Sequence, residues 1–192
     1  MAKLHYITPT VPEEGAQTVR LGTSGQNPAW STLDQGKFVK LSAESEYDLC
    51  SVGDKIEGIV LAVETGTSGG WKIGSIVDEA PMFVMADGSE AAGTGNLAIG
   101  DYVVSGTMDA IGTAITGSLP KVRKATNQPG VAIISGLGGA DTAAAIKVVV
   151  DAALVKVADA QKNILFGWRV ISLGTAGTGV PGTTVVVERV TC

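Results

Sequence analysis

Short alternations of apolar and polar residues, separated by glycine-rich turns, run through most of the chain. The clearest lies between Gly36 and Glu64, where GKFVKLSAESEYDLCSVGDKIEGIVLAVE predicts three short strands. From Ile59 to Val63, strict alternation places three large side chains on one face of a strand. A turn at residues 51–54 separates the second strand from the third. This pattern is typical of a small antiparallel barrel or sandwich.

Further apolar runs predict strands along the rest of the chain. The pair Gly100 and Asp101 repeats the pair Gly53 and Asp54, and each stands before a strand, which predicts the same turn twice. We therefore expect an all-β fold, mainly antiparallel, with a small β-barrel or β-sandwich body and at most a short helix. The additional predicted strands cover residues 71–77, 82–86, 97–104, 131–134, 164–171 and 183–190.

Residues 141–162 are compatible with two structures. Three consecutive alanines from Ala143 favour a helix, and Asp141 before them could cap it. However, β-branched residues alternate from Ile146 to Val150, as they do in strands. We expect a short helical turn at the alanines, followed by strands.

Residues 1–35 differ from the rest of the chain, because prolines interrupt them and polar residues dominate. Such a segment buries little surface by itself. It is either a disordered leader or, as we favour, an extended arm that adds a strand to the sheet of a partner. We expect an arm over 1–35 and a single β body over 36–192. Trp30 is either an anchor at the junction of arm and body or, as we favour, a residue at the rim of the core. The candidate partner-binding residues are the apolar side chains of the arm: Leu4, Tyr6, Ile7, Val11, Val19, Leu21 and Trp30.

Composition and charge narrow the class of partner. The net charge is −5, and binding nucleic acid needs clustered Lys and Arg, so we expect no nucleic-acid partner. The one basic cluster, residues 121–124, fits a solvated strand end, and contact with an acidic partner surface is the alternative. We expect no membrane span and no signal peptide. Cys50 lies in an apolar strand and is expected to be a buried thiol, with a disulfide to Cys192 as the alternative.

Catalytic and metal-binding groups are few in this sequence. His5 is the single histidine and lies in the arm, and zinc-type sites need more Cys or His than the chain has. Glu44 and Glu46 are typical of the solvated face of a hairpin, and Asp78 and Glu79 follow a strand. A carboxylate pair for glycoside hydrolysis is the alternative for these acids. We expect no catalytic residue, no cofactor and no metal, and hence a binding or structural protein, not an enzyme.

Three segments resemble head decoration, or cement, proteins of tailed bacteriophages: GKFVKLSAESEYDLCSVGDKIEGIVLAVE, GWKIGSIVDE and GWRVISLGTAGTGVPGTTVVVERV. The resemblance covers residues 36–192. It implies a β body that stands as a homotrimer on the outside of a head built from HK97-type major capsid proteins. It also implies an N-terminal arm that adds to the capsid sheets. The implied partners are the major capsid protein and further copies of the chain, on the outer surface of the virion head, assembled in the host cytoplasm.

An acidic chain, an extended arm and a glycine-rich β body agree with that role. In this hypothesis the body trimerises through apolar strand faces, and each arm pairs with a capsid subunit. Two alternatives stay open. One is another virion component, such as a tail or neck part. The other is a host-surface carbohydrate-binding β module, which would use an exposed aromatic residue such as Trp71.

Overall fold

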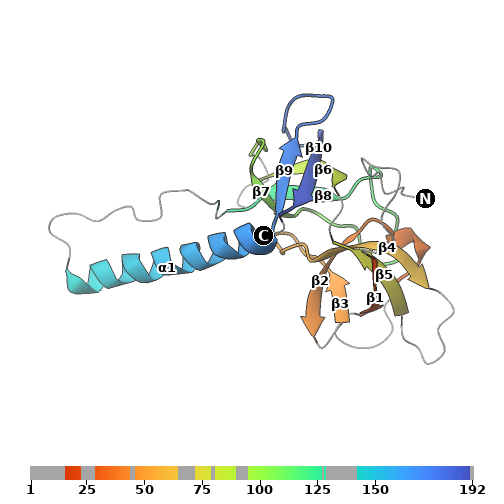
Figure 1. The fold of residues 1–192 in the computed structure, drawn as a ribbon, viewed down its shortest axis with the longest axis horizontal. Coiled ribbons are helices and arrows are strands. Elements are labelled where there is room, and N and C mark those ends of the chain that lie inside the picture. Colours follow the sequence, from red (N-terminus) through yellow and green to blue (C-terminus); the bar gives the residue numbers. More distant parts are fainter. Residues whose placement is uncertain are drawn as a thin grey trace.

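The computed structural model of the chain describes residues 16–22, 29–43, 46–64, 72–78, 81–89, 95–126, 128 and 142–190. Within these ranges the chain forms two five-stranded barrels and one long helix, which projects away from the barrels (Figure 1). The predicted mainly antiparallel β fold with a small β-barrel body is confirmed, but two barrels are present where a single barrel or sandwich was expected.

Barrel 1 is closed in the strand order β1-β3-β2-β4-β5. A short 3-10 helix, Thr32–Asp34, leads into its second strand. The closure places strand neighbours on both sides of every strand, so that the sheet has no free edge. The five strands are β1 (Ala16–Leu21), β2 (Phe38–Ala43), β3 (Glu46–Leu49), β4 (Gly58–Glu64) and β5 (Lys72–Val77).

Barrel 2 is closed in the order β6-β8-β7-β9-β10, and the helix α1 (Ala143–Phe166) lies in its β8–β9 connection. Its strands are β6 (Met82–Ser89), β7 (Tyr102–Ser105), β8 (Lys121–Lys124), β9 (Trp168–Ser172) and β10 (Thr184–Arg189).

The two barrels are copies of one topology. In each, the order around the barrel is first, third, second, fourth and fifth strand of the set. The first and third strands are parallel, and all other neighbours are antiparallel. The chain therefore contains an internal structural repeat, β1–β5 and β6–β10.

The repeat extends to individual hydrogen bonds. The backbone N–H of Gly36, before β2, donates to the carbonyl of Val60 in β4 at 2.8 Å. The N–H of Gly100, before β7, donates to the carbonyl of Val170 in β9 at 2.8 Å. Both glycines have positive φ, 90° and 92°, which favours glycine there. In both barrels the register shifts directly after that valine, so the bulge is repeated as well.

The predicted pair of Gly-Asp turns is confirmed. The carboxylate of Asp54 accepts from the N–H of Ser51 at 2.6 Å, and the N–H of Asp54 donates back to the Ser51 carbonyl at 3.1 Å. Asp101 makes the same two bonds with Ala98, at 2.8 and 3.0 Å. The two turns do not occupy equivalent places in the repeat, because one precedes β4 and the other precedes β7.

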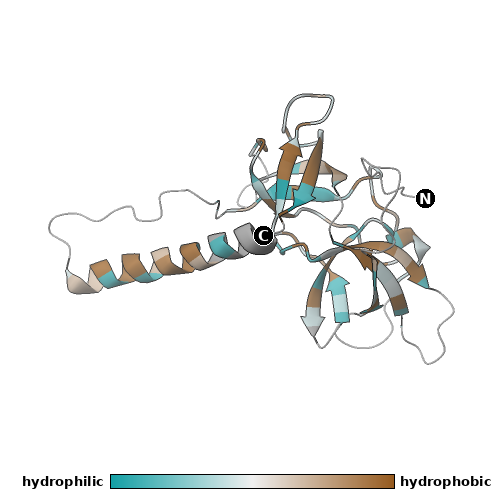
Figure 2. Ribbon diagram, in the orientation of Figure 1, coloured by the Kyte–Doolittle hydropathy of each residue, from teal (hydrophilic) through white to brown (hydrophobic). Residues whose placement is uncertain are grey.

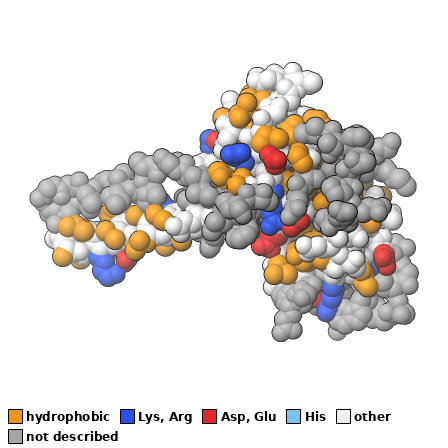
Figure 3. Space-filling model, in the orientation of Figure 1, with side chains coloured by type: hydrophobic (Ala, Val, Ile, Leu, Met, Phe, Trp, Pro, Cys, Tyr) orange, Lys and Arg blue, Asp and Glu red, His pale blue; other side chains and the backbone are white. Residues whose placement is uncertain are grey.

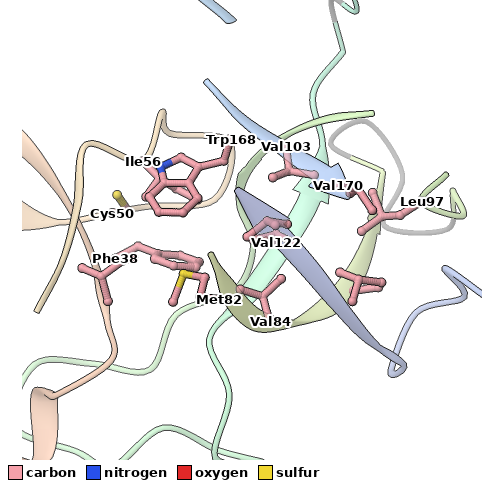
Figure 4. Close-up of a cluster of buried hydrophobic side chains, with 14 of the residues drawn as sticks. Phe38, Cys50, Ile56, Met82, Val84, Leu97, Val103, Val122, Trp168 and Val170 are labelled. Carbon is pink, nitrogen blue, oxygen red and sulfur yellow. The ribbon is translucent and has the colours of Figure 1, made fainter. Parts of the chain in front are cut away.

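A shared apolar core joins the barrels. Phe38 and Ile56 of barrel 1 pack with Met82 and Trp168 of barrel 2, all of them almost fully buried (Figure 4). The sequence predicts contacts between subunits through apolar strand faces. Where Phe38 and Ile59 lie, barrel 2 of the same chain covers this face. A second core fills barrel 1 with its inward-pointing side chains: Leu21, Trp30, Val39, Val60, Val63 and Ile76.

The predicted boundary between arm and body is wrong. Residues 16–21 form β1, which pairs antiparallel with β5 and parallel with β3, so barrel 1 closes only with this strand. Residues 29–35 also belong to barrel 1, because Trp30 is buried in its core. The sequence offered little sign of β1, since Val19 and Leu21 are its only large apolar residues.

The expectation of at most a short helix, followed by strands, is wrong as well. Residues 143–166 are a single α-helix of 24 residues, and β9 starts only at Trp168. Seven alanines in this helix favour helix, and no glycine or proline interrupts residues 141–166. The strand predicted at 131–134 lies outside the described residues, as does Trp71, the first residue of the strand predicted at 71–77.

Candidate functional site

The helix α1 is an addition to the repeated fold. In barrel 1, residues 50–57 connect the third strand to the fourth, whereas residues 125–167 make the equivalent connection in barrel 2. Thr142 caps the start of α1, since its hydroxyl accepts from the N–H of Ala145 at 3.3 Å. At the other end, Gly167 is extended and passes directly into β9. Barrel 1 shows that the fold closes without such a helix.

The surface of α1 is unusually apolar for an exposed element (Figure 2). Large apolar side chains are between 39% and 68% exposed along it, and the described part of α1 contains one buried side chain, Ala153. In Figure 3 hydrophobic side chains lie along the visible side of the helix. We call the large exposed apolar side chains of this helix the α1 apolar surface: Ile146, Val148, Val150, Leu154 and Val155.

The apolar surface carries few charges. Lys147 and Asp151 lie on it one turn apart and form an ion pair at 2.5 Å, with side chains 74% and 57% exposed. Such an exposed pair adds little stability, about 0.3–0.5 kcal/mol. The pair neutralises itself, so this part of the helix offers neither an acidic nor a basic face.

A buried ion pair fastens the long β7–β8 connection to barrel 1. Asp34 and Lys37 are fully buried and lie 2.7 Å apart. The Lys37 ammonium also donates to the carbonyl of Ala110 at 2.5 Å. The Asp34 carboxylate accepts from the N–H of Gly112 at 2.8 Å and from the N–H of Ser31 at 2.7 Å. Every bond is either within barrel 1 or to the connection, which indicates a structural role.

The acidic residues do not form a catalytic pair. Glu46, predicted on a solvated face, is instead ion-paired with Arg20 at 3.2 Å and its side chain is only 15% exposed. Asp78 pairs with Arg189 of β10. Burial raises the pKa of Asp48, partly offset by a hydrogen bond from Ser42. Within the described residues there is no cluster of three His, Cys, Asp or Glu side chains fit for a metal ion. His5, Glu44 and Glu79 lie outside those residues.

The basic cluster at residues 121–124 is strand β8, and two of its three cations form ion pairs. Arg123 pairs with Asp87 at 3.0 Å, and Lys124 pairs with Asp101 at 2.8 Å. These side chains are 19% and 34% exposed, so the cluster is a set of internal ion pairs at a strand and not the freely solvated end that the sequence predicts.

The predicted partner-binding residues divide into two groups. Leu21 and Trp30 are buried in barrel 1, at 1% and 2% exposure, and Val19 packs against the same core. These three side chains serve the fold and are not free to bind a partner, and Trp30 lies within the core instead of at its rim. The remaining four, Leu4, Tyr6, Ile7 and Val11, lie outside the described residues.

The predicted core residues Cys50 and Trp168 are confirmed. Cys50 is 2% exposed and free, and burial raises the pKa of its thiol far above the ordinary value. Trp168 is 1% exposed, so neither it nor Trp30 offers a ring to stack on a sugar. Cys192 and Trp71, on which the disulfide and carbohydrate alternatives depend, lie outside the described residues.

Comparison with known proteins yields no relative. No protein-family model, no curated protein and no solved structure matches the chain. In the described part of the chain no helix is long and apolar enough to cross a membrane. The candidate functional site is thus the α1 apolar surface. Sequence reasoning missed it because β-branched residues alternate there as they do in strands, and the available signals for a long helix were its alanines and the absence of glycine and proline.

Proposed function

We propose that this chain is a structural protein of a virus particle, a decoration protein that stands as a homotrimer on the outer surface of an HK97-type head. The observation that carries the proposal is the α1 apolar surface on a helix that projects from a rigid double barrel (Figures 1 and 3). Most helices in proteins gain their stability by packing an apolar face against another element. Exposed apolar side chains along a projecting helix therefore serve contact with another molecule. The resemblance of residues 36–192 to cement proteins supports the same role.

The proposed mechanism uses the double barrel as a rigid bridge between capsid subunits. The shared core and the buried Asp34–Lys37 pair resist motion of one barrel against the other. The net charge of −5 suits the outside of a head, away from packaged DNA. Many copies bound side by side would add their weak contacts, and would thereby stabilise the expanded shell against outward pressure.

The capsid-binding arm of this proposal is shorter than the sequence indicates. Because β1 belongs to barrel 1, the segment left to pair with a capsid sheet is residues 1–15. It contains four of the candidate partner-binding residues: Leu4, Tyr6, Ile7 and Val11. Addition of a strand to the edge of a capsid sheet is the contact that we propose for it.

The test is binding to expanded heads that lack decoration. The full chain is compared with a chain that starts at Ala16 and with a full-length variant in which Leu4, Tyr6 and Ile7 are replaced by serine. Binding of the full chain and its loss in both variants is expected. If the shortened chain decorates heads equally well, the arm is not the anchor, and if the full chain fails to bind heads, the decoration proposal is wrong.

Copy number in purified particles separates decoration from the tail or neck alternative. Hundreds of copies per particle are expected for a decoration protein, and a handful for a tail or neck part. Quantitative mass spectrometry against the major capsid protein measures this ratio.

A further inference from the structure

The internal repeat provides a control for the role of α1. Barrel 1 and barrel 2 share strand order, register and bulge, yet residues 50–57 suffice in barrel 1 where barrel 2 has residues 125–167. The helix is therefore not required to close a barrel of this kind. Because the barrel closes without α1, this long helix is expected to have a role other than closing the barrel.

The exposed apolar side chains of the molecule are concentrated on this one element. Of the ten large apolar side chains that are exposed in the described residues, five are on α1. The other five are scattered over the barrels and their connections: Leu33, Leu41, Val52, Ile99 and Val180. Scattered apolar residues are ordinary, whereas five large exposed apolar side chains on one helix mark a contact surface.

The charges on the α1 apolar surface indicate which kind of partner it binds. Lys147 and Asp151 neutralise each other, and Lys156 is the remaining exposed charge on the part of α1 whose side chains are described, although the whole chain carries −5. A strongly acidic or basic partner would find little charge to pair with on such a surface. The fitting partner is itself helical and apolar with few charges, and α1 of another copy meets that description.

We propose that α1 is the self-association element of this protein and packs against the α1 helices of further copies. The inference deepens the proposed function, because it names what holds the trimer together, and it rests on that proposal only for the number of copies. The projection of α1 from the barrels in Figure 1 lets helices of different copies meet without collision of the barrels.

The size of the helix favours three or more copies over two. Its 24 residues span about 36 Å at 1.5 Å each. With helix axes 8–10 Å apart, one helix pair would cover a strip roughly 10 Å wide, or about 700 Å² in total for both helices. This is below the ~1,200 Å² of specific interfaces. Three helices in mutual contact bury about three times as much, which exceeds that threshold. Contact with two neighbours is possible because the apolar side chains lie on two sides of the helix. Ile146, Val150 and Leu154 lie on one side, and Val148 and Val155 lie on the other.

The experiment measures the mass of the full chain in solution by light scattering after gel filtration, over a wide range of concentration. The monomer mass is 19.5 kDa, and a mass of three times that value, or a higher multiple, is expected. The double variant Val150→Lys/Leu154→Lys is expected to elute as a monomer. Lysine has a high helix propensity, so the two substitutions should leave α1 helical. The matched control is Leu41→Lys, on β2, where the side chain is 52% exposed; it is expected to keep the wild-type mass.

A second variant guards against misfolding of the first. Residues 126–166 are replaced by a Gly-Ser linker about as short as the equivalent connection of barrel 1, and the product is expected to be a folded monomer. The buried indoles Trp30 and Trp168 report that both barrels are intact, through their fluorescence. A wild-type monomer, an unchanged mass in Val150→Lys/Leu154→Lys, or equal dissociation by Leu41→Lys would overturn the inference.

The same preparations distinguish this inference from the proposed function. A multimer that depends on α1 but ignores expanded heads supports self-association and refutes decoration. A monomer that binds heads does the reverse. Co-sedimentation of a monomeric wild type with phosphatidylcholine vesicles, lost in Val150→Lys/Leu154→Lys, would assign the α1 apolar surface to contact with lipid and also overturn the inference.

Discussion

Replacement of Asp34 by alanine tests how the two barrels are fastened together. Asp34 and Lys37 are both fully buried, and Asp34 also accepts from the backbone of Ser31 and Gly112. Asp34→Ala leaves the Lys37 ammonium buried with the Ala110 carbonyl as its remaining acceptor. Removal of one partner of a buried pair destabilises a protein by about 3–5 kcal/mol, because the other charge stays desolvated.

The expected effect on thermal stability follows from the size of the chain. At 192 residues, each kcal/mol lowers Tm by about 2–4 °C, so Asp34→Ala is expected to lower Tm by roughly 6–20 °C. Lys37→Met is expected to cost less, because Asp34 keeps its two backbone donors. The exposed pair provides the control, and Asp151→Ala is expected to cost under about 0.5 kcal/mol.

Urea unfolding followed by tryptophan fluorescence and by circular dichroism measures these differences. In a Trp71→Phe background, Trp168→Phe leaves Trp30 to report on barrel 1 and Trp30→Phe leaves Trp168 to report on the shared core, and the shared core predicts one transition for both. A fastening role for the pair is refuted if Asp34→Ala costs less than about 1 kcal/mol, or if Lys37→Met is the more damaging change.

Three further outcomes follow from the described contacts. Burial opposes ionisation of Asp87, but hydrogen bonds from Thr107 and Arg123 outweigh it and lower the pKa of this carboxyl below 3.8. Its contribution to stability is therefore present above pH 3.8 and is lost as pH falls through the folded-state pKa. Asp87→Asn should flatten that part of an acid-unfolding curve, and an unchanged curve would contradict this expectation. In a Cys192→Ser background, the thiol of Cys50 should react with a disulfide reagent only on unfolding, and rapid labelling of the native protein would show that Cys50 is accessible. A side chain on Gly179 would meet the Leu97 carbonyl at 1.9 Å, so Gly179→Ala should cost about 1–3 kcal/mol in urea unfolding, and an unchanged free energy of unfolding would contradict this.

The strands were predictable where apolar residues alternate between turns. The apolar runs from Ile59 to Val63 and before Glu188 predict the strands β4 and β10. The common face predicted for Ile59, Leu61 and Val63 is wrong, because the bulge after Val60 places Ile59 in the shared core and Val63 in the core of barrel 1. The turn at Asp54 was predictable because its hydrogen bonds join residues three apart.

The missed elements depend on contacts that no local pattern displays. The strand β1 is mostly polar and is fixed by pairing with β3 and β5, so only closure of the barrel explains it. In α1, residues such as Val148 and Val155 are poor helix formers, and apolar side chains on several sides hide the helical period. The candidate site was missed for this second reason. The repeat was hidden as well, because the two copies carry different residues at equivalent, paired positions.

That difference between the copies makes the contact between the barrels one-sided. The outer face of barrel 1 is apolar and receives barrel 2, whereas the same face of barrel 2 carries charge and a phenol. The face that seats barrel 2 on barrel 1 is therefore not repeated on barrel 2. In the order of the repeat, Phe38, Ile59 and Val77 correspond to Tyr102, Arg169 and Glu188.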